Sequence, residues 1–228
     1  MAVRFSRHRD LRDNGSGKST LLSILAAKLN AVRIGQGIIE REQAAARAQD
    51  AFTLHKRASR RNFFFSAEDF IDYIGWVSRT KEEARREIAR IDADDTVSDK
   101  AYAKMPHYRT LNDLSGLYAE NLAEQSHGEG FLDFFASRLK PGGLYLLDEP
   151  EGALSYEKQF ALALMIRDAA KQSQFILATH SPILAAIPGA EIWEASENGF
   201  EKRRYEEIEN IQFLKLFMES PERMFRAE

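Results

Sequence analysis

Apolar residues in the second half of the chain fall into short continuous runs separated by segments with helical spacing. The runs at 144–147 and 175–179 are typical of buried parallel strands. Between them we expect a helix that begins after the N-cap Ser155 and ends near Lys171. Its predicted buried face comprises Phe160, Ala161, Leu164 and Met165. Strand, helix and strand in this order form a βαβ unit, which predicts a parallel sheet with a right-handed crossover.

The first half of the chain has a less regular pattern. Apolar residues at helical spacing predict a helix over 21–29. The aromatic run 63–65 fits a strand that leads into a capped helix starting at Ser66, although three aromatic residues alone do not distinguish a strand from a buried helix. Residues 79–104 are dense in charge and carry only a thin apolar stripe. We therefore expect them to form a solvent-exposed helical arm.

Further elements are predicted on both sides of the βαβ unit. Apolar residues at helical spacing predict a helix over 130–139, ended by a Pro-Gly-Gly turn. After the unit we expect two short strands near 191–195 and 200–205 and a helix near 207–218. A small helix then follows, with Ser220 as its cap and Pro221 at its first position.

Composition narrows the class of protein. The 228 residues are 44% hydrophobic and 29% charged, which predicts a single globular domain. The lack of cysteine excludes a disulfide scaffold, a cysteine-bound zinc site and a thiol nucleophile. A net charge of −3 gives no overall attraction to nucleic acid. We find neither a signal peptide nor a membrane segment in the pattern, so a cytoplasmic protein is expected.

A glycine-rich turn precedes the first predicted helix and suits a phosphate-binding loop. Its small residues let backbone N–H groups converge on phosphate oxygens, while Lys18 reaches the β- and γ-phosphates and Ser19 binds Mg²⁺. The predicted nucleotide-binding residues are Asn14, Gly15, Ser16, Gly17, Lys18, Ser19 and Thr20. Arg12 occupies the position where the full loop pattern has its first glycine. The alternative is a plain glycine turn with an incidental lysine.

Two acidic residues follow the apolar run 144–147. At the end of a buried strand, Asp148 would lie beside the metal ion together with Ser19. Glu149 would then be placed to polarise an attacking water molecule. An Asp-Glu pair by itself is more often a surface turn, so this interpretation depends on the loop at Lys18.

Two more positions suit contacts with a γ-phosphate. Ser126 and Gly128 form a Ser-x-Gly turn at the start of a predicted helix, where free N–H groups favour anions. His180 follows the strand predicted at 175–179, at the end of the sheet where ligands bind in parallel α/β proteins. An ordinary serine cap and a structural histidine are the alternatives.

Four segments together resemble the ATP-binding cassette ATPases, and more narrowly the stand-alone bacterial AAA/ABC-type ATP-binding proteins. These segments are NGSGKST, EQSHGEGF, GLYLLDEPEGALS and FILATHSPIL. The resemblance implies an α/β fold, namely a P-loop NTPase whose mainly parallel sheet is flanked by helices. It also implies one domain over 1–228, with a helical and signature subdomain inserted at about 66–125.

The resemblance also implies roles for individual residues. Lys18–Thr20 would belong to the Walker A loop and Ser126–Glu129 to the signature motif. Asp148 and Glu149 would be the Walker B pair, with Glu149 as the catalytic base. The D-loop would be 151–155, and His180 would be the switch histidine. The Q-loop residue stays open between Ser66 and Glu68.

Such ATPases imply ATP and Mg²⁺ as ligands and a homodimer as the working unit. The signature motif of one subunit would cover the ATP that the Walker motifs of the other subunit hold. Family members carry a small β-subdomain and a central strand before Walker A. Few residues precede Arg12, so we expect an N-terminally shortened member.

Several functions remain open from the sequence. The leading interpretation is an Mg²⁺-dependent ATPase whose coupled process is unknown. Arg12 favours instead a non-hydrolysing nucleotide switch or a truncated remnant. A DNA-repair or defence ATPase subunit is a third possibility, supported by a local basic cluster, and a transporter subunit is a fourth. The cluster consists of Lys56, Arg57, Arg60 and Arg61.

Overall fold

The computed structural model describes most of the predicted core. The described residues are 3–4, 18–33, 53–54, 59, 61–115, 127–152, 154–196 and 199–225. The domain division predicted from the sequence stays a prediction.

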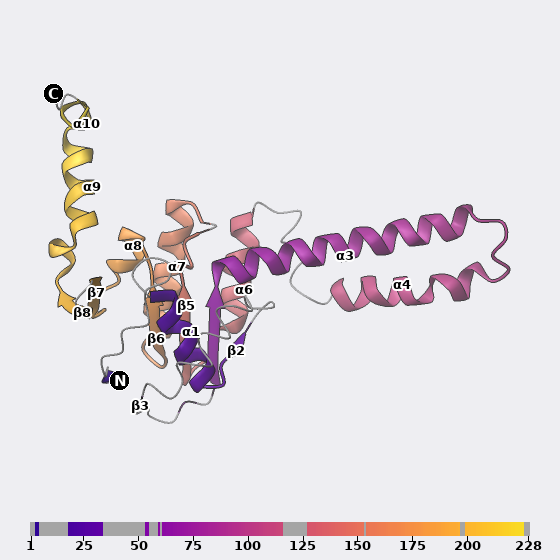
Figure 1. Ribbon diagram of the computed structural model, residues 1–228, viewed down its shortest axis with the longest axis horizontal. Helices are drawn as coiled ribbons and strands as arrows, with labels where there is room; N and C mark the ends of the chain where they lie inside the picture. Colours follow the sequence, from indigo (N-terminus) through magenta and orange to yellow (C-terminus); the bar gives the residue numbers. More distant parts are fainter. Residues whose placement is uncertain are drawn as a thin grey trace.

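A four-stranded parallel sheet forms the centre of the molecule (Figure 1). In order across the sheet, its strands are β2 (Val32–Arg33), β4 (Arg61–Ser66), β5 (Gly143–Asp148) and β6 (Gln174–Ala178). Every residue of β5 is buried, because described strands pair with it on both sides. The prediction of a mainly parallel sheet flanked by helices is confirmed.

Strand β6 is less buried than its apolar sequence predicts. Only Ala178 is fully buried, while Phe175, Ile176 and Leu177 are partly exposed. The reason lies in the order of the sheet, where β6 has a described partner on one side only. The prediction of a buried strand over 175–179 is therefore wrong in its degree of burial.

Helices cover both faces of the sheet because side chains alternate along each strand. Phe64 and Leu146 point to the face covered by α1 (Lys18–Lys28), which contributes Leu22 and Leu25. The opposite face carries the larger hydrophobic cluster, to which Ala67 and Phe70 of the helix after β4 and three further helices contribute. The three further helices are α6 (His127–Arg138), α7 (Tyr156–Ala169) and α8 (Pro182–Ala185).

Aromatic rings fill the larger cluster. The ring of Phe65 lies between 4.8 and 6.2 Å, centroid to centroid, from four other phenylalanine rings. These are Phe70, Phe131, Phe134 and Phe135. Such distances are typical of attractive edge-to-face and tilted pairs. The aromatic run 63–65 thus forms a strand that packs against α6.

The buried face of α7 differs from the sequence prediction. The side chains of Leu162, Ala163 and Ile166 face the core, whereas Phe160 is 57% exposed and Leu164 is 36% exposed. The observed stripe lies mainly on the other side of the helix, although the predicted Met165 is partly buried and packs against the core. Helical periodicity alone fits either stripe, so the side from which the sheet packs against α7 decides that Leu162, Ala163 and Ile166 are buried. The predicted N-cap Ser155 precedes α7 without a side-chain capping bond.

A long helical hairpin projects away from the sheet (Figure 1). It consists of α3 (Ala67–Ala93) and α4 (Lys100–Ser115). In the connection, Asp94 accepts a hydrogen bond from the backbone N–H of Thr96, and Asp99 accepts one from that of Tyr102. These aspartate turns end one helix and begin the next. The exposed arm predicted at 79–104 is confirmed as mainly helical, but the chain turns back within it.

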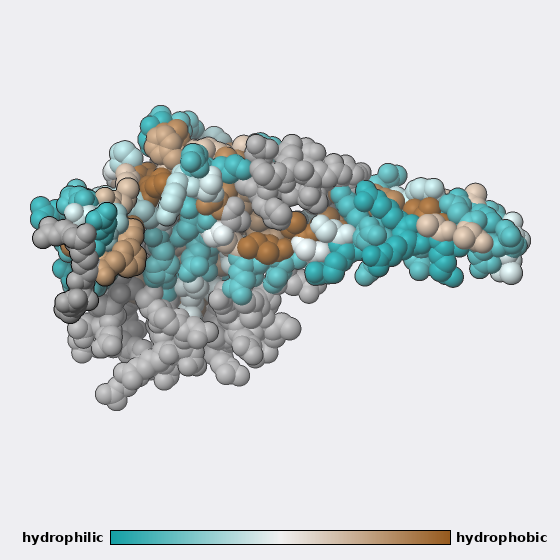
Figure 2. Space-filling view, turned by 90° about the horizontal axis from the view of Figure 1, so that it is seen from above, coloured by the Kyte–Doolittle hydropathy of each residue, from teal (hydrophilic) through white to brown (hydrophobic). Residues whose placement is uncertain are grey.

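Ion pairs and hydrophilic side chains stabilise the hairpin in solvent. Figure 2 shows a mainly hydrophilic surface along this arm. Lys104 Nζ lies 2.6 Å from Asp92 Oδ1 and so links the two helices. The hydrogen bond from Lys104 to Asp92 raises the pKa of the Lys104 ammonium above its ordinary value.

The C-terminal elements agree with the sequence prediction. Strands β7 (Ile192–Ser196) and β8 (Gly199–Arg203) form an antiparallel hairpin. A 3₁₀ turn at Tyr205–Glu207 leads into α9 (Glu209–Glu219) and α10 (Pro221–Met224), which extend from the end opposite the arm (Figure 1).

Two further observations complete the fold. Strand β1 (Val3–Arg4) pairs antiparallel with β3 (Thr53–Leu54). Among the described helices, none is both long enough and apolar enough to cross a membrane.

Candidate nucleotide-binding site

The polar residues predicted from the sequence meet at one edge of the sheet. In the register of the strands, Ser66 of β4 and Ala178 of β6 both lie beside Asp148, the last residue of β5. The carboxyl ends of these strands therefore lie together, as in other α/β folds with a ligand at this edge. Helix α1, which begins at Lys18, packs against the same strands.

Three short distances connect the predicted site residues. Ser19 Oγ donates a hydrogen bond of 2.9 Å to Asp148 Oδ1. Lys18 Nζ lies 3.2 Å from His180 Nε2. His180 Nε2 in turn lies 3.9 Å from Glu149 Oε1. The structure thus brings together residues that are far apart in the sequence, and their chemical roles stay predictions.

Burial divides these groups into two layers. Asp148 is 4% exposed and lies beneath the surface. The side chains of His180 and Glu149 are 58% and 53% exposed, so an incoming ligand can reach them. A buried carboxylate beneath exposed ammonium, imidazole and carboxylate groups can hold a charged ligand and offer it both acid and base groups.

The backbone of Glu149 has an unusual conformation. Its φ of +47° lies in the left-handed region, which costs a residue with a side chain about 1–2 kcal/mol. Its N–H donates a 2.8 Å hydrogen bond to the carbonyl oxygen of Ala178, which holds the turn against β6. Strained residues of this kind cluster at functional sites, so the turn favours a functional role for Glu149.

We expect Glu149→Gly to be more stable than Glu149→Ala by about 1 kcal/mol. Both variants lose the carboxylate, but glycine has no Cβ and adopts a positive φ without steric cost. Chemical denaturation of the two purified proteins measures the difference. Equal stabilities, or a more stable alanine variant, would contradict the left-handed conformation at this position.

The oxygen atoms of Ser19 and Asp148 fit a magnesium site. Mg²⁺ prefers oxygen ligands and is usually held by one or two protein groups together with phosphate oxygens and water. A hydroxyl and a carboxylate 2.9 Å apart satisfy the protein part of that requirement. In the ranges that the structure describes, no group of three or more His, Cys, Asp or Glu residues forms a metal site.

Of the remaining predicted nucleotide-binding residues, the structure describes Thr20 and Gly128. Thr20 lies in the first turn of α1, and Gly128 lies in the first turn of α6. The residues Asn14, Gly15, Ser16, Gly17 and Ser126, and the basic residues Lys56, Arg57 and Arg60, lie outside the described residues. Arg61 begins β4 with an exposed side chain.

Sequence analysis missed a polar network beside the site. Glu151 Oε1 accepts hydrogen bonds from the backbone N–H groups of His180, at 2.6 Å, and Ser181, at 3.1 Å. Ser181 Oγ donates to Gln159 Oε1 at 2.7 Å, and Gln159 Nε2 donates to the carbonyl oxygen of Leu154 at 3.0 Å. Gln159 lies on the side of α7 opposite to the predicted buried face, so no pattern in the sequence indicated this network.

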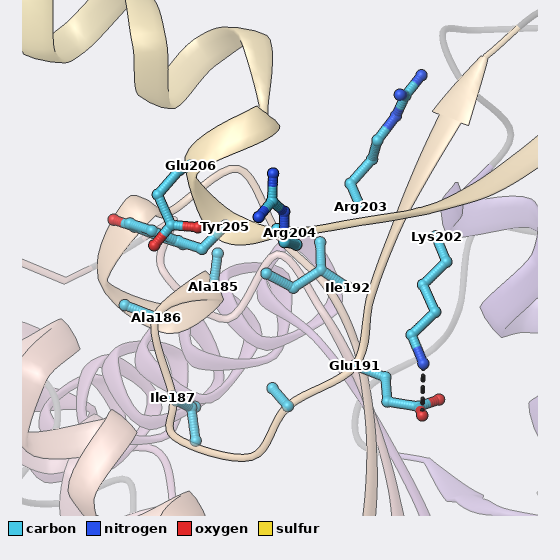
Figure 3. A pocket seen from close by; sticks show the side chains of 11 residues that line it. Ala185, Ala186, Ile187, Glu191, Ile192, Lys202, Arg203, Arg204, Tyr205 and Glu206 are labelled. Atoms are coloured by element: carbon cyan, nitrogen blue, oxygen red, sulfur yellow. Dashed lines mark hydrogen bonds and ion pairs between the residues drawn. The ribbon is translucent and has the colours of Figure 1, made fainter.

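A separate hollow lies between α8 and the β7–β8 hairpin (Figure 3). It measures about 500 Å³ and includes none of the converging site residues. Its cations are paired: Lys202 lies 2.8 Å from Glu191, Arg204 lies 2.6 Å from Glu207, and Arg203 lies 2.7 Å from Glu201. The hydrogen bond from Lys202 lowers the pKa of Glu191. This hollow therefore carries little unpaired positive charge for an anionic ligand.

Comparison with known proteins agrees with the geometry. A family described as "AAA domain, putative AbiEii toxin, Type IV TA system" matches residues 129–186. The matched segment includes Asp148, Glu149 and His180, but it begins far after Lys18 and so does not cover the predicted phosphate-binding loop. No curated protein and no solved structure matches the chain. The family match and the parallel sheet support an AAA-type P-loop ATPase domain with a nucleotide-binding function.

Proposed function

We propose that this protein binds ATP with Mg²⁺ and hydrolyses it to ADP and phosphate. The observation that carries this proposal is the convergence of Lys18 and Ser19 with Asp148, Glu149 and His180 at the carboxyl edge of the sheet. An ammonium group for the phosphates, a metal-binding oxygen pair and a carboxylate that can orient the attacking water are groups that enzymes of phosphoryl transfer use, and the imidazole adds a hydrogen-bond donor beside them.

Nucleotide binding is assigned to the start of α1 and the loop before it. The Lys18 ammonium and the positive end of the helix dipole both attract the β- and γ-phosphates. Lys18 Nζ now lies beside His180 Nε2, so a bound phosphate oxygen would take a place within reach of both groups. We assign the loop 14–17 to the same phosphates on the basis of its glycines.

Hydrolysis requires a water molecule in line with the γ-phosphate. The water oxygen forms a bond to phosphorus as the bond to the bridging oxygen of ADP breaks, and Glu149 accepts the proton that the water loses. His180 donates a hydrogen bond to a γ-phosphate oxygen and stabilises the charge that develops there. Mg²⁺, held through Ser19 and Asp148, would supply charge neutralisation at the phosphate oxygens.

The working unit that we propose is a head-to-tail homodimer. The turn at Ser126–Gly128 would act on the nucleotide held by the other subunit. This assignment rests on the resemblance of EQSHGEGF to a signature motif and on the predicted anion site at the start of α6.

Lys18→Ala tests the binding step. We expect the dissociation constant for ATP with Mg²⁺ to rise about 10- to 100-fold, because a hydrogen bond to a charged group is worth about 1.5–3 kcal/mol. Isothermal titration of both proteins measures the change. Lys28→Ala, at the last turn of the same helix, is the matched control and should bind like the parent. Equal affinities for the Lys18 variant and the parent would refute the site.

A second candidate function is an ATPase subunit of a defence complex. The description of the matched family names a putative toxin of a type IV toxin–antitoxin system, and this favours the candidate over a transporter subunit. The same ATP site would serve this function, so the titration with Lys18→Ala tests the step that both candidates share.

A further inference from the structure

The turn after β5 and the segment after β6 are joined by one side chain. Glu151 lies in the turn that follows Asp148 and Glu149, and its Oε1 accepts the N–H groups of His180 and Ser181. Two hydrogen bonds to the same carboxylate oxygen fix the backbone of the second segment to the first. The backbone that carries the His180 side chain is thereby held by a residue two places beyond Glu149 in the same turn.

The two N–H groups that Glu151 accepts differ in the other contacts that hold their residues. The N–H of Ser181 is also 3.0 Å from Thr179 Oγ1, and the Ser181 hydroxyl is held by Gln159. For the N–H of His180, Glu151 is the acceptor that the described part of the chain provides. Loss of the Glu151 carboxylate would therefore release the backbone at His180 first and leave Ser181 anchored.

The other oxygen of Glu151 argues against a purely stabilising role. Oε2 is buried and has no hydrogen-bond partner among the described residues. A buried acceptor without a partner destabilises the folded state. A buried polar atom of this kind calls for an explanation, and a role at a functional site is one such explanation.

We propose that Glu151 is a positioning residue for His180. Its carboxylate holds the His180 backbone so that the imidazole stays within reach of both Lys18 and Glu149. Glu151 itself touches neither the nucleotide nor the reacting atoms. The part of this proposal that concerns turnover rests on the proposed ATPase function, whereas the part that concerns the backbone does not.

Two variants of Glu151 separate the hydrogen bonds from the charge. Glu151→Ala removes the acceptor, while Glu151→Gln keeps a carbonyl oxygen that can accept both N–H groups. We expect amide hydrogen exchange at His180 to become faster in the alanine variant, with a smaller change at Ser181, and exchange at both residues to stay unchanged in the glutamine variant. Glu191→Ala, which removes an exposed carboxylate paired with Lys202, is the control and should leave exchange at 180–181 unchanged.

Steady-state kinetics then test the catalytic consequence. A displacement of about 1 Å of a catalytic group costs roughly 100-fold in rate, so we expect Glu151→Ala to lower kcat about 100-fold with little change in KM. Glu151→Gln should retain most of the kcat. In a His180→Ala background, Glu151→Ala should have no further effect on kcat, because it acts through His180.

Each outcome decides one of the two proposals. Unchanged exchange at 180–181 in Glu151→Ala would overturn the positioning role whether or not the protein hydrolyses ATP. Additive losses in the double variant, or a loss in Glu151→Gln equal to that in Glu151→Ala, would overturn it as well. An absence of turnover in the parent protein, with faster exchange in Glu151→Ala, would refute the ATPase function and leave the backbone contact established.

Discussion

We expect Glu149→Gln to lower ATP turnover at least ~100-fold and to leave ATP affinity within about twofold of the parent. The amide has nearly the same shape as the carboxylate but cannot accept the proton of the attacking water. Glu149 lies beside His180 and is 53% exposed, so the amide should disturb neither packing nor the Ser19–Asp148 contact. Phosphate release under saturating ATP with Mg²⁺, measured together with nucleotide titration, tests both parts.

Glu157→Gln is the matched control for this experiment. Glu157 is an exposed carboxylate in the first turn of α7, and its substitution should leave turnover unchanged. If Glu149→Gln and the parent hydrolyse ATP at the same rate, the activity belongs to a contaminant or to another base. The assignment of Glu149 would then be wrong, whatever the affinity for ATP.

We expect Phe65→Ala to destabilise the protein by about 3–5 kcal/mol. The Phe65 ring is 1% exposed and lies among four phenylalanine rings, so its removal leaves a cavity that the surrounding helices cannot close. Folded domains are stable by only about 5–15 kcal/mol, so this single loss is a large part of the total. Urea denaturation monitored by circular dichroism measures the change.

Phe160→Ala is the control for the aromatic core. The sequence pattern places Phe160 in the core, but its side chain is 57% exposed on α7. We therefore expect its removal to change stability by no more than about 0.5 kcal/mol. A loss at Phe160 as large as the loss at Phe65 would contradict the orientation of α7 in the structure.

The fold could be predicted from the sequence where a local signal is strong. The run 144–147 forms a buried strand because it is continuous and apolar, and the following Asp148 and Glu149 lie at its carboxyl end as predicted. The C-terminal strands and helices were also identified from local patterns. In each case the residues that determine the element are neighbours in the sequence.

Features that depend on distant partners could not be predicted in the same way. The stripe of α7 that is buried depends on which side the sheet approaches, and spacing alone does not determine this. The partial burial of β6 depends on its place in the strand order. The reversal of the helical arm depends on aspartate turns at Asp94 and Asp99, where short polar residues end helices.

The candidate site shows the same distinction. Lys18, Ser19 and His180 were identified because they occur in short motifs whose chemistry is recognisable in the sequence. The contact of Glu151 with the backbone of His180 joins residues 29 positions apart and uses no side chain of the second residue. A side-chain contact to the backbone imposes no residue type on its partner, so it leaves no motif.

The length of helix α3 would turn a small movement at the carboxyl edge of the sheet into a larger movement at the far end of the arm. The helix begins directly after Ser66, which lies beside Asp148 in the strand register, and it runs for 27 residues. At 1.5 Å per residue its far end lies about 40 Å from its base, so a tilt of about 5° at Ser66 would move that end by about 3.5 Å. A sub-ångström movement at the candidate site would thus be amplified along α3 into a displacement of its far end as large as an atom's diameter.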